Sequence, residues 1–116
     1  MQIVIHRGTH EIGGSCVEIR TRQTKILLDL GLPIDFDSRP QEQQKQIRRE
    51  ALEWAQDADA IFISHFHADH HGLLPDTHQD VAIYATAGTA AMMHVTEVIH
   101  GRGDADYLRH ISVLSK

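Results

Sequence analysis

The sequence lacks the features that mark secreted, membrane-spanning or strongly basic proteins. It has a single cysteine, so no internal disulfide can form, which is typical of a reducing compartment. No apolar run reaches the roughly 20 residues of a membrane helix, and no basic segment followed by an apolar one opens the chain as in a signal peptide. The formal net charge of −5 disfavours a broad electrostatic grip on nucleic acid, although a local basic groove is compatible with it. We therefore expect a cytoplasmic protein without a membrane segment.

Length and composition predict one globular unit. The chain has 116 residues, of which 41% are hydrophobic and 23% are charged, and these shares are ordinary for a folded domain. A chain of this length buries roughly two-thirds of the surface that it exposes when unfolded, which is enough for one modest core. No internal repeat, low-complexity tract or linker divides the sequence, so residues 1–116 are treated as a single part.

Hydrophobic periodicity predicts a mixed α/β fold. Short apolar, β-branched segments indicate strands at 2–6, 16–19, 25–30, 60–63 and 81–84. The second and third strands are joined by a polar turn and should form a hairpin. Apolar residues at helical spacing predict two helices, at about 42–56 and 89–100. Residues 102–116 have no assigned role, and only Ile111 and Val113 alternate like the start of a strand.

Each predicted helix has one apolar stripe that should face the sheet. In the first helix the stripe consists of Ile47, Ala51, Trp54 and Ala55. In the second helix it consists of Ala91, Met92, Val95, Val98 and Ile99. Because strands and helices alternate along the chain, the helices should form a layer outside the sheet.

The segment 65–71 is the most informative part of the chain. Four possible metal ligands follow the apolar strand 60–63 within six residues, namely His65, His67, Asp69 and His70. Imidazole nitrogens and carboxylate oxygens are the ligands of hydrolytic zinc sites, and the open end of a strand is where α/β folds place ligands. The first two histidines can turn to one side, and the later pair can face a second metal. The segment therefore predicts metal-assisted hydrolysis rather than a histidine-rich surface loop without a function.

Asp29 is a second candidate residue, because it follows the apolar run 26–28. A carboxylate at the end of a buried strand needs a partner. One natural partner is the far nitrogen of a ligand histidine, or the backbone of the histidine loop, which Asp29 would hold from behind. The alternative is an aspartate that opens a turn before Gly31, and from these residues alone the turn is the simpler interpretation.

The run His-Phe-His-Ala-Asp-His after an Ile-Phe-Ile-Ser strand resembles the signature of the metallo-β-lactamase superfamily. The resemblance implies an αββα sandwich, represented here mainly by its N-terminal half as a mixed sheet with outer helices. It implies that His65 and His67 bind one zinc and that Asp69 and His70 bind a second, with manganese or iron as alternatives. A hydroxide between the metals would be the nucleophile, and Asp69 would also orient it. Asp29 matches the aspartate that the family places after its third strand, which reverses the preference for the turn.

The loop 8–16, Gly-Thr-His-Glu-Ile-Gly-Gly-Ser-Cys, resembles the corresponding loop of the ribonuclease J and messenger-RNA 3′-end nuclease branch. This similarity favours RNA or another phosphodiester as the substrate. A small-molecule ester, lactone or thioester hydrolase is the alternative within the same fold. A non-catalytic metal-binding or interaction module is the alternative outside enzymes.

The family pattern also includes ligands that this sequence does not contain. Complete members supply another histidine for the first metal, a bridging aspartate and a late histidine for the second metal, all from further downstream. With two ligands per metal each site would be open and weak, and the inner apolar face of the sheet would be exposed. The chain is then a fragment of a longer enzyme, a member of a homo-oligomer or complex that completes the site, or an inactive product. His71 lies outside the pattern, either behind the ligands or in solvent.

Overall fold

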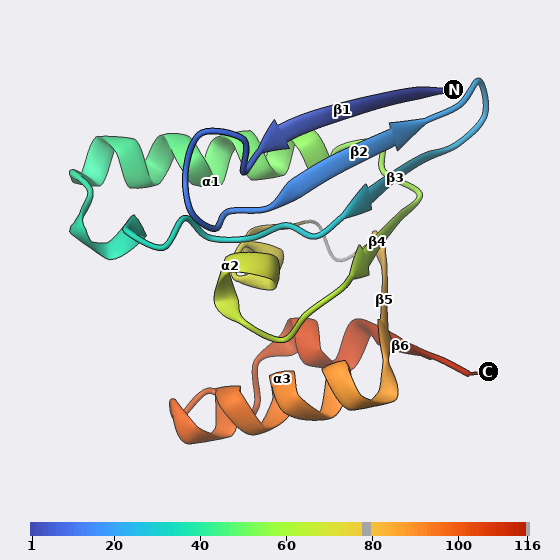
Figure 1. Cartoon of the computed structure of the whole chain (residues 1–116). Helices are drawn as coiled ribbons and strands as arrows, with labels where there is room; N and C mark the ends of the chain where they lie inside the picture. The colour runs from blue at the N-terminus through green and yellow to red at the C-terminus, as the bar shows by residue number, and fades with distance from the viewer. Residues whose placement is uncertain (78–79, 116) are drawn as a thin grey trace.

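The computed structural model describes residues 1–77 and 80–115. Within these residues the chain forms one six-stranded sheet, in which the strands lie side by side in sequence order (Figure 1). The strands are β1 (Gln2–Arg7), β2 (Cys16–Arg20), β3 (Lys25–Leu28), β4 (Ala60–Ile63), β5 (Ala82–Thr86) and β6 (Ile111–Leu114). The five predicted strands are present with small shifts at their ends, and the alternation at Ile111 and Val113 marks the sixth.

The sheet is mixed. Strands β1, β2 and β3 pair antiparallel, whereas β3, β4, β5 and β6 pair parallel. Parallel neighbours need a crossover connection, and helical segments lie in each crossover. These are α1 (Gln41–Ala55), α2 (Ala68–His71) and α3 (Ala87–Ile99), with short 3-10 turns η1 (Phe36–Ser38), η2 (Leu74–Asp76) and η3 (Asp106–His110). The α/β class that the sequence predicted is confirmed.

The core lies between the helices and one face of the sheet. Figure 1 shows α1 beside β1 and β2, α3 at the opposite end of the molecule near β5 and β6, and α2 between the two helices. The predicted stripe of α1 is confirmed, because Ile47, Ala51 and Ala55 are buried and Trp54 is partly buried. The Trp54 ring stacks on His6 of β1, with 4.7 Å between the ring centroids.

The predicted stripe of α3 is wrong. The structure buries Met93 and Glu97. The residues of the predicted stripe are exposed instead, from 42% for Met92 to 76% for Ile99 among its large members. Periodicity locates apolar positions on a helix, but it does not say which face of the helix meets the rest of the protein. At about 3.6 residues per turn, Met93 and Glu97 lie on the side of α3 opposite to the predicted stripe.

Glu97 is buried with its charge compensated. The Nε of Arg102 donates a hydrogen bond to Glu97 Oε2 at 2.7 Å. Burial alone would raise the pKa of this carboxyl, but hydrogen bonds from Arg102 and Tyr107 outweigh burial and hold the pKa below its ordinary value. Glu97 therefore belongs to the packed face of α3, although a charged residue is ordinarily expected on the exposed face of a helix.

The other face of the sheet is apolar and open. The register places Ile3 opposite Ile19, and Ile5 opposite Val17, which in turn lies opposite Leu28. The side chains of Ile3 and Ile5 are 59% and 56% exposed, because α1 packs on the opposite face. The exposed apolar face expected from the sequence is therefore present.

Among the described residues, no helix is long and apolar enough to cross a membrane.

Candidate metal centre

The predicted ligands lie at the carboxyl end of β4. This strand ends at Ile63, and the chain then passes through residues 64–67 into α2. His65 and His67 belong to the connecting loop, whereas Asp69 and His70 belong to the first turn and the centre of α2. His67 is exposed, and the other three side chains are partly exposed, so an ion from solvent can reach them.

His65 and His67 meet directly. Their Nε2 and Nδ1 atoms are 2.8 Å apart, so one nitrogen donates a hydrogen bond to the other. The two rings cross nearly at right angles, at 85°, with centroids 4.3 Å apart. The ring of His70 lies 5.3 Å from that of His65. The structure thus brings all three imidazoles into one cluster.

Asp69 and His70 form the second pair. The Nε2 atom of His70 is 3.5 Å from Oδ2 of Asp69. On the other side of the ring, Nδ1 of His70 is 2.8 Å from Oδ2 of Asp29. An ionised carboxylate only accepts hydrogen bonds, so this contact assigns the proton to Nδ1 and leaves the lone pair of Nε2 directed toward Asp69.

Asp29 is positioned by an unusual backbone conformation. Its φ angle is +62°, in the left-handed region that aspartate tolerates better than most residues. This turn ends β3 and places the buried carboxylate under the β4 loop. Besides His70, the carboxylate accepts hydrogen bonds from the Ser64 backbone N–H at 2.8 Å and from the Ser64 hydroxyl at 2.6 Å. Sequence reasoning predicted the histidine partner, while Ser64 was missed.

The glycines of two other loops pack against α2. A Cβ atom on Gly31 would overlap the backbone carbonyl of Asp69, and a Cβ on Gly13 would come within 2.8 Å of the Asp69 Cβ. Backbone hydrogen bonds run from Ser15 N–H to the Asp69 carbonyl at 3.1 Å and from Leu30 N–H to the His70 carbonyl at 2.9 Å. The glycine loop 8–16 therefore supports the ligand segment through close backbone approach.

His71 is the residue of this region that sequence reasoning did not place. It is 3% exposed, and its Nε2 lies 2.8 Å from the backbone carbonyl of Phe66. Burial lowers the pKa of the imidazole. Because a carbonyl oxygen only accepts hydrogen bonds, the contact with Phe66 requires the proton on Nε2, which is the donor. The sequence gave no sign that the His71 side chain points inward, because His71 directly follows the predicted ligand His70.

The donor types fit zinc, but the described residues hold the donors only as pairs. Across residues 1–77 and 80–115, no group of three or more histidine, cysteine, aspartate or glutamate side chains is arranged to hold a metal ion. Catalytic zinc is held by three protein ligands as a rule. The His65–His67 and Asp69–His70 pairs thus each require at least one further donor.

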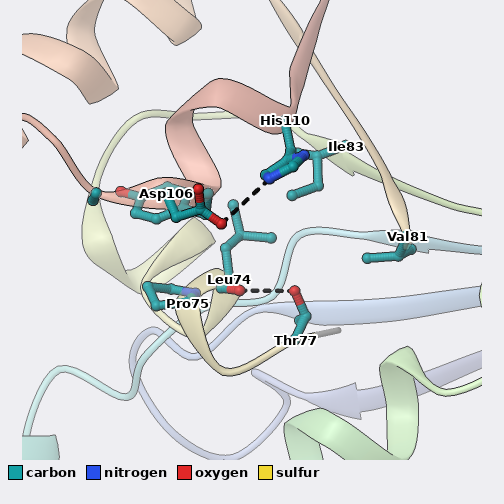
Figure 2. Close-up of a pocket in the computed structure, with 9 residues that line it drawn as sticks. Leu74, Pro75, Thr77, Val81, Ile83, Asp106 and His110 are labelled. Carbon is teal, nitrogen blue, oxygen red and sulfur yellow. Dashed lines mark hydrogen bonds and ion pairs between the residues drawn. The ribbon is translucent and has the colours of Figure 1, made fainter. Parts of the chain in front are cut away.

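One cavity in the described part of the chain borders this region, and another lies outside it. A groove of about 390 Å³ runs past His67 and Asp69 and is walled by Leu32, Pro33 and Phe36. A second cavity, of about 190 Å³, lies between η2, β5 and η3 and contains none of the predicted ligands. Figure 2 shows Asp106 and His110 at its edge, joined by a contact of 3.3 Å between Oδ2 and Nε2.

The sequence is similar to several curated proteins. It is 35% identical over 91 residues to an RNase J-like protein of Methanocaldococcus jannaschii, covering 78% of this chain and 19% of that protein. It is 31% identical over 100 residues to the transcription termination factor FttA of Methanothermobacter thermautotrophicus, covering 80% and 15%. It is 31% identical over 99 residues to the cleavage and polyadenylation specificity factor 73 of Drosophila melanogaster, covering 85% and 13%.

The chain belongs to the metallo-β-lactamase superfamily, in the branch of the ribonuclease J-like and messenger-RNA 3′-end-processing proteins. It spans less than a fifth of the length of these curated relatives. No protein-family model matches the sequence.

A solved structure supports the fold of this superfamily member. A protein of unknown function from Enterococcus faecalis V583 superposes with a TM-score of 0.67 and 16% sequence identity, covering 98% of this chain and 33% of that one. At this level of identity the likeness concerns the fold alone. The metal ligands and the role of Asp29 stay predictions, because neither the structure nor the relatives' names assign them.

Proposed function

We propose that this chain carries part of the active site of a zinc-dependent hydrolase that cleaves phosphodiester bonds in RNA. The observation that supports the proposal most directly is the clustering of His65, His67, Asp69 and His70 at the end of β4, with Asp29 bonded behind His70. The names of the relatives, an RNase J-like protein and a cleavage and polyadenylation factor, favour RNA over other substrates. Residues 1–116 would be the N-terminal part of the catalytic domain, in the cytoplasm.

Each residue has a distinct part in this proposal. His65 and His67 hold one metal ion, and Asp69 and His70 hold the second, with manganese or iron as alternatives to zinc. Zinc in such a site supplies Lewis-acid polarisation of a phosphoryl oxygen and a hydroxide at neutral pH. Asp69 also orients the attacking water through its carboxylate. Asp29 keeps the proton of His70 on Nδ1 and so keeps the Nε2 lone pair toward the site.

The missing donors must come from outside the described pairs. A second copy of the chain, a partner chain or further sequence of a longer protein would each bring them. A non-catalytic metal-binding module is the second candidate function, and the absence of a three-donor group in residues 1–77 and 80–115 is the observation in its favour. Turnover distinguishes the two candidates, since both predict bound metal.

The first experiment compares the wild-type chain with His67→Ala and Asp69→Ala, using His94→Ala as the matched control on the exposed side of α3. Zinc, manganese and iron per chain are measured by elemental analysis of gel-filtered protein. Hydrolysis is measured on single-stranded RNA and on a nitrophenyl ester. We expect up to two metals per wild-type chain, a loss of metal and RNA cleavage in the two ligand variants, and no change in the control.

The possible results separate the proposals. Full RNA cleavage by His67→Ala or Asp69→Ala would contradict the site assignment. Metal without turnover, at every oligomeric state, would favour the non-catalytic module. Ester hydrolysis without RNA cleavage would point to a small-molecule hydrolase of the same fold.

A further inference from the structure

His71 connects the ligand loop to the interior of the protein. It is the last residue of α2 and is 3% exposed, whereas the preceding His70 faces the site. Its ring lies 6.4 Å from that of Tyr107 in η3, measured between centroids. Glu97 of α3 interacts electrostatically with His71 and is paired with Arg102. His71 therefore stands where α2, α3 and η3 meet.

Within the described residues, the hydrogen bond that this ring makes is directed at the loop. Nε2 of His71 donates to the backbone carbonyl of Phe66 at 2.8 Å. Its Nδ1 is buried and has no hydrogen-bond partner among the described residues. A buried imidazole with one unpaired nitrogen is a costly choice if the position needs only apolar volume, because a leucine or methionine would fill it without desolvating a polar atom. The bond to Phe66 is thus the feature that histidine adds here.

The location of this bond matters for the predicted ligands. Phe66 lies between His65 and His67 in the sequence, so its carbonyl belongs to the peptide that joins Phe66 to His67. The other end of the loop is fixed by the His70 N–H, which donates to the His67 carbonyl at 2.9 Å. Holding both peptides restricts the backbone angles that set the relative direction of the His65 and His67 rings.

We propose that His71 is a positioning residue, which fixes the Phe66 carbonyl and thereby pre-orients His65 and His67 for a divalent transition-metal ion. The inference rests on the proposed function, because it takes these two histidines as the ligands. It predicts that the Nε2–H donor, rather than the volume of the ring, supports metal affinity. Residues that orient metal ligands from behind typically contribute 10- to 100-fold in affinity, so a measurable effect is expected.

Two variants separate the donor from the volume. In His71→Gln the amide nitrogen lies the same number of bonds from Cα as Nε2 and can still donate to Phe66. In His71→Met a side chain of similar length carries no donor. Ile47→Val, in the buried stripe of α1, controls for mild loss of core packing away from the loop.

Co²⁺ binding to the full chain is titrated by visible absorption, and thermal unfolding of the metal-free chains is recorded beside it. We expect His71→Met to weaken Co²⁺ binding about tenfold or more. His71→Gln should recover most of this loss, and Ile47→Val should bind like the wild type. Unchanged affinity in His71→Met would overturn the proposal. An equal loss in both His71 variants would also overturn it, because the ring volume would then be responsible.

A second measurement does not depend on metal. The ¹⁵N heteronuclear NOE of the His67 backbone amide reports the order of the loop in metal-free protein. We expect a rigid amide in the wild type and in His71→Gln, and a more mobile one in His71→Met. If the wild-type chain binds no Co²⁺, the two pairs do not hold the ion without the further donors, and this measurement alone decides whether His71 fixes the loop. Equal order in all variants would then refute the role of His71.

Discussion

Asp29 combines a left-handed φ of +62° with a carboxylate that serves three hydrogen-bond donors. A non-glycine residue in this conformation is strained by roughly 1 kcal/mol. The strain persists because the turn delivers the carboxylate to both Ser64 and His70, which lie on separate segments. One residue therefore ties the end of β3 to the loop after β4 and to α2.

Replacing Asp29 by asparagine tests this role. Asparagine tolerates the backbone angle, but its amide has one acceptor oxygen instead of two, so a bond to Ser64 or His70 is lost. We expect Asp29→Asn to weaken zinc binding about tenfold and to lower the metal-free free energy of unfolding by about 1–2 kcal/mol. Isothermal titration with Zn²⁺ and urea denaturation measure the two effects. Asp35→Asn, at an exposed ion pair, is the control, and equal zinc affinity in the Asp29 variant would refute the prediction.

Gly31 offers a second test at the residue scale. A methyl group there would overlap the backbone of Asp69, which cannot move without breaking the neighbouring bond from Leu30 to His70. We expect Gly31→Ala to lower the free energy of unfolding by about 3 kcal/mol. Gly88→Ala is the matched control, because its Cβ would meet nothing within 4 Å and it lies within α3. The control should raise stability by roughly 0.5–1 kcal/mol, and similar values for both variants would be incompatible with the close approach.

At the scale of elements, α3 shows how a helix can turn a different face inward than its apolar pattern indicates. Its packed face carries Met93 and Glu97, and Arg102 neutralises the buried carboxylate. The outer face carries Val95, Val98 and Ile99, all at least 47% exposed. A helix that is apolar on both faces is ordinarily covered on both, so the outer face of α3 is a second apolar surface beside the open side of the sheet.

Two adjacent methionines test the orientation of α3. Met93 is completely buried, whereas Met92 is 42% exposed. We expect Met93→Ala to lower the free energy of unfolding by about 3 kcal/mol, because it leaves a cavity. Met92→Ala should change it by less than about 1 kcal/mol. Chemical denaturation of the two variants measures both values, and the reverse order would restore the stripe predicted from the sequence.

At the scale of the whole molecule, the sheet has only one covered face in the described residues. The open side presents Ile3, Ile5 and Leu28 to solvent, and contiguous apolar patches of this kind are typical of surfaces that associate. The same chain carries its predicted ligands as incomplete pairs. A further layer of structure packed on the open face would bury its apolar side chains. The same layer would be a source of the donors that the two ligand pairs lack.

The open face predicts self-association of the isolated chain. Light scattering coupled to gel filtration should show an apparent mass that rises with protein concentration. Replacing Ile3 and Ile5 together by glutamine should reduce this rise, and it should leave the thermal unfolding of the monomer nearly unchanged because both side chains are mostly exposed. A double exchange of Arg22 and Gln23 by alanine, in the exposed turn before β3, serves as the control. A mass that is independent of concentration in the wild type would contradict the expectation.

The amino-acid sequence by itself determined the features that depend on neighbours along the chain. The short β-branched runs specified the strands, the spacing of Ile47, Ala51 and Ala55 specified the buried side of α1, and the strand before His65 placed the ligand loop at an end of the sheet. The run from His65 to His70 was also sufficient to identify the superfamily. Each of these signals is local, because backbone sterics and side-chain periodicity act over a few residues.

Only the tertiary structure decided the features that join distant segments. The inward face of α3, the bond from His71 to Phe66, the contact of Gly31 with Asp69 and the Ser64 partner of Asp29 all depend on which surfaces meet after the chain has folded. Local pattern cannot choose between two faces of one helix when both carry apolar residues. Packing makes that choice, since burying a polar group is tolerated only where another segment supplies its partner.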